Sequence, residues 1–191
     1  MKGHEPGTLG LPRVLVRVVE SDPRWATLFE AAAREITDTL PVSGIALEHV
    51  GSTAVPGLSA KPVIDMALLI PEEAAFQQVR ERLATLAFAY RGDKGTRGGR
   101  LFVRECAPEV RTHHLHLYIA GAPEWDRYLL FRDTLRARPE LRDAYARLKR
   151  QLAQQFPEDR FAYLDGKTAF VEGVLREGEA IRASARESPG S

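Results

Sequence analysis

Cysteine is nearly absent from this sequence, since Cys106 is the one thiol among 191 residues. A single thiol excludes an internal disulfide and a cysteine cage for zinc. The sequence also lacks a run of roughly 18 apolar residues that could cross a bilayer. It has no apolar stretch of the signal-peptide kind near Met1. These absences predict a cytoplasmic protein with no membrane segment.

An excess of charge of one sign is missing too, because 27 Lys and Arg stand against 26 Asp and Glu. A net charge of +1 gives no overall attraction toward a membrane and disfavours nucleic acid as a partner, although a local patch could still attract one. With 44% hydrophobic residues, the chain can build its own core. We expect one domain over residues 13–183, with flexible ends at 1–12 and 184–191.

Hydrophobic spacing and proline positions divide the chain into strands and helices. Short β-branched or apolar runs predict strands at Val14–Val19, Ile45–Val50, Pro62–Ile70, Leu101–Glu105 and Thr112–Ile119. Helical spacing predicts helices that begin at Asp22-Pro23 and Pro71, and others at Pro123–Arg138, Pro139–Phe156 and Phe161–Ala185. The glycine-rich and arginine-rich segment Arg91–Arg100 is expected to be a mobile basic loop. This order predicts an α/β or α+β domain with a helical C-terminal layer.

The segment from His49 to Thr53 stands where the second predicted strand ends. Glycine has no Cβ, so a strand that breaks at Gly51-Ser52 lets the backbone approach a ligand closely. If a helical turn follows, its N–H groups and the hydroxyls of Ser52 and Thr53 form an anion site suited to phosphate. The alternative is an ordinary strand-to-helix turn with a serine cap.

Asp65 is the one charge between Pro62 and Ile70, the most apolar run of the chain. A buried carboxylate costs several kcal/mol unless a cation, a metal or hydrogen bonds meet it. Strand alternation places Asp65 on one face with Ala67, and we expect this face to line the cleft that begins at Gly51-Ser52. The alternative is a structural carboxylate that caps a nearby loop.

Three histidines fall in the strand predicted at Thr112–Ile119. Alternation places His114 and His116 on one face and His113 on the other. Two imidazoles at i and i+2 can ligate one metal, bind phosphate when protonated, or transfer a proton. A lone histidine is usually a core group satisfied by hydrogen bonds, and a pair on one face is less often so. Asp65, His114 and His116 are therefore the candidate catalytic and metal-binding set.

The segment Arg127–Arg150 carries eight Lys or Arg against three Asp or Glu. It is a candidate docking face, although surface charges usually pair with neighbouring acids. Lys167 follows Gly166 near the expected start of the last helix. The run Gly166-Lys167-Thr168 lacks the upstream glycine of a P-loop and does not follow a strand, so that motif is excluded.

Several of these segments stand in a fixed order over about 150 residues. They are Asp22–Trp25, Glu48–Leu58, Lys61–Asp65, His113–His116, Phe131–Asp133 with Leu135-Arg136, Tyr145 with Lys149, and Tyr163 with Gly166-Lys167. Together they resemble the GrpB family, whose domain also occurs fused to dephospho-CoA kinase in some bacteria. That family resembles the nucleotidyltransferase superfamily. The resemblance implies a mixed β-sheet with flanking helices and a helical C-terminal layer.

The superfamily also implies roles for particular residues. It places Gly-Ser at a strand end to hold nucleotide phosphates, and Asp-x-Asp and a third acid on later strands to hold two divalent cations. Gly51, Ser52 and Asp65 match this layout, but Ala67 stands at the second acid position and His116 at the third. Two-metal phosphoryl transfer needs several carboxylates. Asp65 with two histidines suits one divalent ion, Zn²⁺, Mn²⁺ or Fe²⁺ better than Mg²⁺.

We favour a domain that binds a nucleotide or another phosphorylated small molecule, with transfer of a nucleotidyl or phosphoryl group as its enzymatic form. Phosphate would contact Gly51, Ser52 and Thr53, with cationic help from Lys61, Arg100, Arg132 and Lys167. A second hypothesis is a hydrolase that uses a metal-bound water at Asp65, His114 and His116. A third is a non-catalytic accessory module that senses a ligand or docks a partner through Arg127–Arg150.

Overall fold

The structure, a computed structural model, describes residues 9–93 and 99–187. Its centre is a six-stranded sheet in the order β2-β3-β6-β5-β4, and the short β1 pairs with β6. Strands β3 and β6 are parallel, whereas the remaining neighbours are antiparallel. The strands are β1 (Leu11–Pro12), β2 (Ala46–Val50), β3 (Ile64–Ile70), β4 (Ala89–Asp93), β5 (Arg100–Ala107) and β6 (Val110–Ile119).

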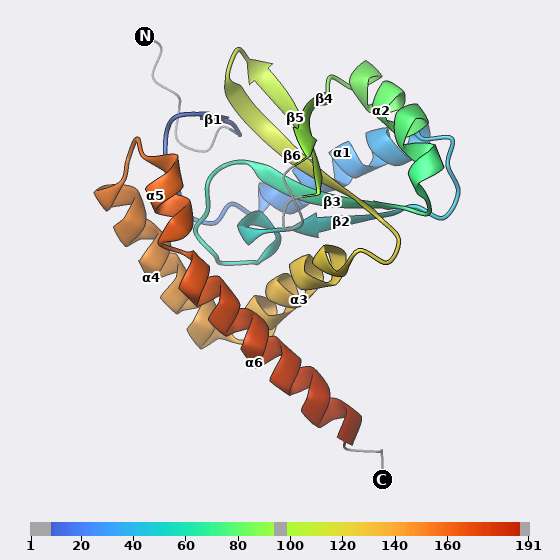
Figure 1. Cartoon of the computed structure of the whole chain (residues 1–191). Helices are drawn as coiled ribbons and strands as arrows, with labels where there is room; N and C mark the ends of the chain where they lie inside the picture. Colours follow the sequence, from blue (N-terminus) through green and yellow to red (C-terminus); the bar gives the residue numbers. More distant parts are fainter. Residues whose placement is uncertain (1–8, 94–98, 188–191) are drawn as a thin grey trace.

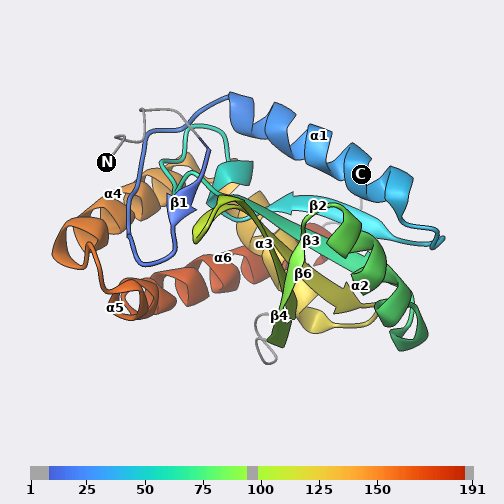
Figure 2. The ribbon, with the colours of Figure 1, turned by 90° about the horizontal axis from the view of Figure 1, so that it is seen from above.

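Helices lie on both faces of the sheet (Figures 1 and 2). Helices α1 and α2 cover one face, α3 lies against the other, and α4 to α6 extend the layer that α3 begins. Their bounds are α1 (Arg24–Thr39), α2 (Phe76–Thr85), α3 (Pro123–Ala137), α4 (Pro139–Gln155), α5 (Arg160–Asp165) and α6 (Thr168–Glu187), with 3-10 turns η1 (Ser52–Ala54) and η2 (Glu73–Ala75). This mixed α/β arrangement with a helical C-terminal layer confirms the predicted fold class.

Strand β3 lies between β2 and β6, as its apolar run predicted. Its alternate residues Ile64, Met66 and Leu68 are fully buried on the side of α1 and α2, where Trp25 and Ile36 also pack. The residues between them face α3 and the C-terminal helices. Because neighbouring strands are in register, Asp65 lies opposite Val50 of β2 and His114 of β6. Ala67 lies opposite Glu48 and His116. The β3 register therefore determines which side chains share the second face.

The strand predicted at Val14–Val19 does not form. Only Val19 pairs there, through an isolated bridge to Ala60. Val16 is buried against Leu152 and Tyr163 instead, while the side chain of Val14 is exposed. β-Branched residues favour a strand only where a neighbouring strand can pair with them. Within the described residues this segment has no such neighbour beyond the Val19–Ala60 bridge.

Several predicted boundaries also shift. Leu11–Pro12 pair with β6 and so are not part of a loose end, and α6 runs on to Glu187. Residues 1–8 and 188–191, which were expected to be flexible, lie outside the described residues. Of the expected loop 91–100, the first three residues belong to β4 and the last begins β5. Residues 94–98 again lie outside the description.

The helix predicted at Phe161–Ala185 is two helices, with the break at Gly166-Lys167. The Asp159 carboxylate caps α5 by accepting hydrogen bonds from the N–H groups of Phe161 and Ala162, each at 3.0 Å. A Cβ on Gly166 would come within 2.6 Å of the Leu152 side chain. Glycine at this break therefore lets α4 approach closely. Across residues 9–93 and 99–187, no helix is long and apolar enough to span a bilayer.

Candidate functional site

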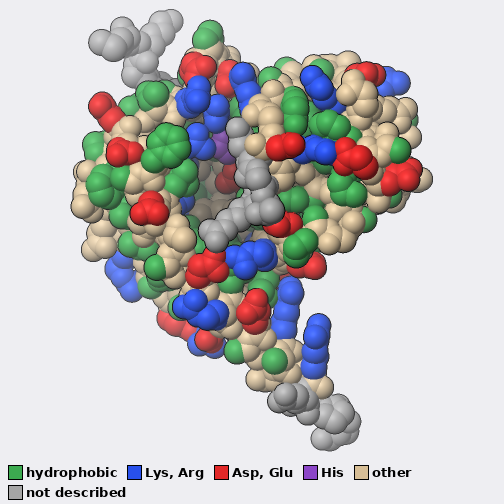
Figure 3. Space-filling view, in the orientation of Figure 1, with side chains coloured by type: hydrophobic (Ala, Val, Ile, Leu, Met, Phe, Trp, Pro, Cys, Tyr) green, Lys and Arg blue, Asp and Glu red, His purple; other side chains and the backbone are tan. Residues whose placement is uncertain are grey.

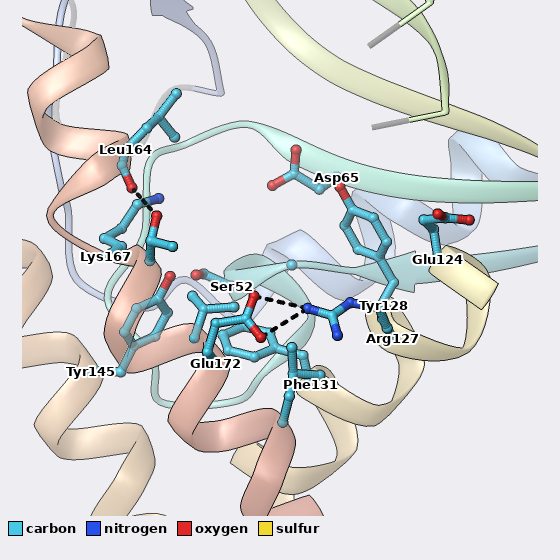
Figure 4. A pocket seen from close by; sticks show the side chains of 14 residues that line it. Ser52, Asp65, Glu124, Arg127, Tyr128, Phe131, Tyr145, Leu164, Lys167 and Glu172 are labelled. Carbon is cyan, nitrogen blue, oxygen red and sulfur yellow. Dashed lines mark hydrogen bonds and ion pairs between the residues drawn. The ribbon is translucent and has the colours of Figure 1, made fainter. Parts of the chain in front are cut away.

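A cleft with two lobes lies between the C-terminal helices and the sheet face opposite α1 and α2, which we call the cavity face. Figure 3 shows the cleft as a hollow with a histidine inside. The aromatic lobe, of about 340 Å³, is lined by Phe131, Tyr145, Val171 and Leu175. The cationic lobe, of about 280 Å³, is lined by Lys61, Lys149, Arg160, Lys167, His114 and His116. The side chains common to both lobes are Ser52, Asp65, Tyr128, Leu164 and Lys167. All five are labelled in Figure 4.

Asp65 occupies the point where the two lobes meet, close to the end of β2. Gly51 has a φ of +68°, and a Cβ placed on it would lie 2.7 Å from Asp65 Oδ2. Glycine is therefore needed at position 51 for two reasons, its left-handed backbone and the nearby carboxylate. Asp65 Oδ1 accepts a hydrogen bond from His114 Nδ1 at 3.0 Å. Burial alone would raise the pKa of Asp65, but this hydrogen bond and the neighbouring positive groups hold it below its usual value.

The three histidines of β6 divide between the faces as strand alternation predicted. His114 and His116 face the cationic lobe, with ring centroids 6.4 Å apart, and the His116 ring also lies 5.3 Å from that of Tyr128. His113 points to the opposite face, where it meets Phe88 and Arg104. Burial and the Arg104 charge lower the pKa of His113 to about 3. The structure thus brings Asp65, His114 and His116 into one cavity beside Gly51-Ser52.

These side chains do not form the three-donor metal set that the sequence predicted. Among residues 9–93 and 99–187, no three His, Cys, Asp or Glu side chains are grouped so that they could hold a metal ion. His114 Nδ1 is directed at Asp65 rather than at a shared centre. Ala67, at the second acid position, is fully buried in a cluster with Val50 and Tyr118. The donor set therefore fits neither a two-metal nor a one-metal centre as it stands.

Two lysines meet on one aromatic ring in the cationic lobe. Lys61 Nζ and Lys167 Nζ lie 4.5 and 4.6 Å from the ring centroid of Tyr163. Burial lowers the pKa of each lysine to about 8, and the positive charge of Arg160 acts in the same direction. Asp65 opposes this effect on both. The lobe thus holds several cations near a single carboxylate.

Lys149 of α4 lies deeper in the same lobe, with only 2% of its surface exposed. Its Nζ is 2.9 Å from Ser52 Oγ and also donates to the carbonyl of Ser59. It sits 4.6 Å from the ring centroid of Tyr145. Burial is the largest cause of a pKa far below the usual lysine value. Lys149 thus connects the C-terminal helices to the turn after β2.

The predicted phosphate-contact residues Gly51, Ser52 and Thr53 all line the cleft, as do Lys61 and Lys167. The hydroxyl of Thr53 is engaged, because its Oγ1 lies 3.0 Å from His49 Nε2. Reasoning from the sequence did not name Lys149, Arg160 and Tyr128 as site residues. Of these three residues, Lys149 alone appeared in the sequence analysis, as part of the family resemblance.

Arg100 and Arg132, the other predicted cationic helpers, do not line either lobe. Arg100 belongs to the far end of the sheet, where it pairs with Glu73 at 2.7 Å and lies over the ring of Phe76. Arg132 ties α3 to β2, because its Nη1 donates to Glu48 at 2.6 Å and to the His49 carbonyl at 3.0 Å. Acidic side chains of the protein itself hold both guanidinium groups. The prediction that Arg100 and Arg132 help to bind phosphate in the cleft is therefore corrected.

The basic segment Arg127–Arg150 is also largely engaged within the molecule. Arg127 pairs with Glu172 of α6, a contact visible in Figure 4, and Arg138 pairs with Glu177. Arg136 donates to the Ala54 carbonyl, and Lys149 is buried in the cleft. The segment therefore joins helices to one another and to the sheet, which leaves little of it as the docking face that the sequence suggested.

Comparison with known sequences places these observations in a family. A family model described as GrpB protein matches residues 15–177. A UPF0157 protein of Pseudomonas aeruginosa is 40% identical, over 88% of this chain and 69% of that protein. The UPF0157 protein YqkA of Bacillus subtilis is 32% identical, over 94% of this chain and 52% of its own length. A dephospho-CoA kinase of Mycolicibacterium paratuberculosis is 26% identical, over 91% of this chain and 48% of the kinase.

Two solved structures show how far the fold is shared. The crystal structure of GrpB from Enterococcus faecalis has a TM-score of 0.77 and 34% identity, over 85% of this chain and 96% of that chain. The Cid1 poly(U) polymerase with bound MgGTP has a TM-score of 0.51 and 14% identity, over 72% of this chain and 44% of that chain. At this identity the likeness to Cid1 is one of fold alone, and the fold is nucleotidyltransferase-like.

Proposed function

The chain belongs to the GrpB family, and we propose that it binds a nucleotide or another phosphorylated small molecule in the cleft. One observation carries the proposal: Lys61, Arg160 and Lys167 line a lobe in which Asp65 is the only acid among the described lining residues. Ammonium groups that are partly removed from water and close to one another are costly without an anion. A phosphate between them would offset that cost.

The second lobe favours a ligand with an apolar or planar part beside its phosphate. Phe131 and Tyr145 line it together with aliphatic residues of α6. Aromatic side chains stack well on flat rings, and a few polar groups then fix the orientation of the ligand. A cationic lobe that adjoins an aromatic lobe suits a nucleotide better than it suits inorganic phosphate. The nucleotide in the Cid1 structure supports this choice through the shared fold.

Transfer of a nucleotidyl or phosphoryl group by the usual two-metal route is not part of this proposal. That route needs carboxylates that neutralise and position a pair of cations. Position 67 is a buried alanine here, and position 116 is a histidine beside Tyr128. Any group transfer in this cleft would therefore use lysine and arginine in place of the metal pair.

Titration of ATP, pyrophosphate and adenosine into the purified protein tests the proposal. We expect ATP and pyrophosphate to bind and adenosine to bind more weakly, with and without a chelator. Replacing Lys61 or Lys167 with Met should weaken ATP binding about 10- to 150-fold, the value of one charge-assisted hydrogen bond of roughly 1.5–3 kcal/mol. Arg34→Ala, an exposed change on α1, is the matched control. Equal affinity of the lysine variants and the wild type would refute the proposal.

A further inference from the structure

Ser52 and Lys149 form a close pair whose chemistry goes beyond ligand binding. Ser52 lines both lobes of the cleft, so its side chain is open to a bound molecule from either side. Lys149, which lines the cationic lobe, lies with its Nζ 2.9 Å from Ser52 Oγ and is almost completely buried. An accessible hydroxyl with a buried amine at hydrogen-bond distance is the arrangement of a nucleophile and its base.

The surroundings of Lys149 favour its neutral form. Among the described residues, no carboxylate lies within ion-pair distance of its Nζ, which contacts Ser52, the Ser59 carbonyl and the Tyr145 ring. Burial lowers the pKa of Lys149 well below the usual value, the nearby charges of Lys167 and Arg150 lower it further, and Asp65 opposes them. A neutral amine donates to the Ser59 carbonyl and still offers one lone pair. That lone pair can accept the hydroxyl proton of Ser52.

We propose that Ser52 is a covalent nucleophile and that Lys149 is its general base. Building on the proposed phosphate binding, the electrophile is the phosphorus of a phosphoanhydride. Ser52 Oγ bonds to phosphorus, its proton passes to Lys149 Nζ, and the bond from phosphorus to the leaving phosphate oxygen breaks. The leaving oxygen takes the proton from Lys149, and a phosphoserine remains. Water or an acceptor hydroxyl then gives its proton to Lys149 and attacks phosphorus. The bond from phosphorus to Ser52 Oγ breaks, and Ser52 takes the proton from Lys149 and becomes a hydroxyl again.

The other charged groups of the cleft fit this reaction. Lys61, Arg160 and Lys167 line the lobe on which Ser52 opens, where they can neutralise the charge that develops on the phosphoryl oxygens. Gly51, with its positive φ, turns the chain sharply at the end of β2 and begins the short turn that contains Ser52. The pair is thus fixed by a strand end on one side and by α4 on the other.

A fluorophosphonate probe tests the pair directly, because it labels activated serines and carries no phosphate charge. We expect an intact-mass increase for one adduct, which peptide mapping places on Ser52. Ser52→Ala should remove the adduct. Lys149→Met and Lys149→Arg should slow labelling about 10²- to 10⁴-fold, the usual contribution of a general base. Ser43→Ala, at an exposed serine in the segment that leads into β2 and outside the cleft lining, should label like the wild type.

A pH profile of the wild type keeps the proposal testable if the Lys149 variants do not fold. The labelling rate should rise with pH and then level off once Lys149 is neutral. A rate that keeps rising tenfold per pH unit would mean attack assisted by hydroxide alone and would overturn the proposal. So would the absence of a Ser52 adduct, or equal labelling of folded Lys149 variants.

Pyrophosphate distinguishes failure of the Ser52–Lys149 pair from failure of the proposed phosphate binding. If both proposals hold, pyrophosphate should protect Ser52 from the probe. Labelling that depends on Lys149, without any pyrophosphate binding, would refute the phosphate site and retain the catalytic pair. Pyrophosphate binding without labelling would do the reverse.

Discussion

The two faces of the central sheet use neighbouring residues of the same strands for opposite purposes. On the face covered by α1 and α2, Ile64, Met66 and Leu68 of β3 are fully buried. On the cavity face, Asp65 accepts a hydrogen bond from His114 across to β6. Side chains of a strand alternate, so the step from Ile64 to Asp65 moves from an apolar core to a charged cleft. One face is a packed apolar core, and the other carries partly buried charged groups, which cost stability.

The largest expected effect is a loss of stability on the face covered by α1 and α2. Trp25 is 3% exposed in the cluster that packs on β3. Trp25→Ala should lower the free energy of unfolding by about 3–5 kcal/mol, because it removes a large buried side chain and leaves a cavity. Denaturant unfolding measures this loss. ATP affinity of the folded fraction should stay unchanged, and a large loss of affinity would show that the two faces are not independent.

The second effect concerns pH below neutrality. His49 stacks on Phe29 with ring centroids 4.7 Å apart, and burial lowers its pKa to about 4. Unfolding restores a pKa near 6.5, so the unfolded chain takes up an extra proton below that pH. As pH falls from 6.5 to about 4, His49 should therefore lower the free energy of unfolding by about 1.4 kcal/mol per pH unit. His49→Phe should lose that part of the slope, and an unchanged slope would contradict the assignment.

The cavity face should respond at alkaline pH. Lys61 and Lys167 have pKa values of about 8 in the folded chain and about 10.5 when exposed. Between about pH 8 and 10.5 the unfolded chain therefore binds more protons, and the unliganded protein should become more stable as pH rises. Thermal unfolding across this range measures the gain. Lys61→Met should reduce it, whereas ATP affinity of the wild type should fall over the same range as ammonium charge is lost.

The smallest expected effect is at Arg100. Its guanidinium is occupied by Glu73 and Asp93 away from the cleft. Arg100→Ala should change ATP affinity by less than about twofold, because it removes no charge from the cationic lobe. Calorimetric titration of ATP into Arg100→Ala and into Lys167→Met compares the two losses of affinity. A loss of affinity equal to that of the lysine variant would bring Arg100 back into the site.

Local pattern was sufficient to predict how residues share a face of the sheet. The period of two in β3 and β6 placed Asp65, His114 and His116 together and His113 apart, and the register confirms this placement. The same local reasoning was wrong at Val14–Val19, because a strand also requires a partner and the segment pairs only at Val19. The identity of a neighbour across the sheet is a tertiary property that β-propensity does not contain.

The helical half of the site could not be predicted in the same way. Helical spacing shows which side of α4 is apolar, but it does not show that Lys149 of that side meets Ser52. Nor does it distinguish Lys149, which lies in the cleft, from Arg132, which is held by Glu48. Both are basic residues on neighbouring helices, and only the packing of α3 and α4 against the sheet separates their roles.

The division of the cleft between the sheet and the C-terminal helices also affects how the protein is made. Lys61 and Asp65 emerge from the ribosome about 100 residues before Arg160 and Lys167. At roughly 5–20 residues per second, the last strand of the sheet, which ends at Ile119, is made about 2–10 s before Arg160 and Lys167. During that interval Lys61 remains in water, and Asp65 lacks the positive charge of Lys167. The sheet can therefore form without the energetic cost of the charged cleft, which arises only when the last helices close over it.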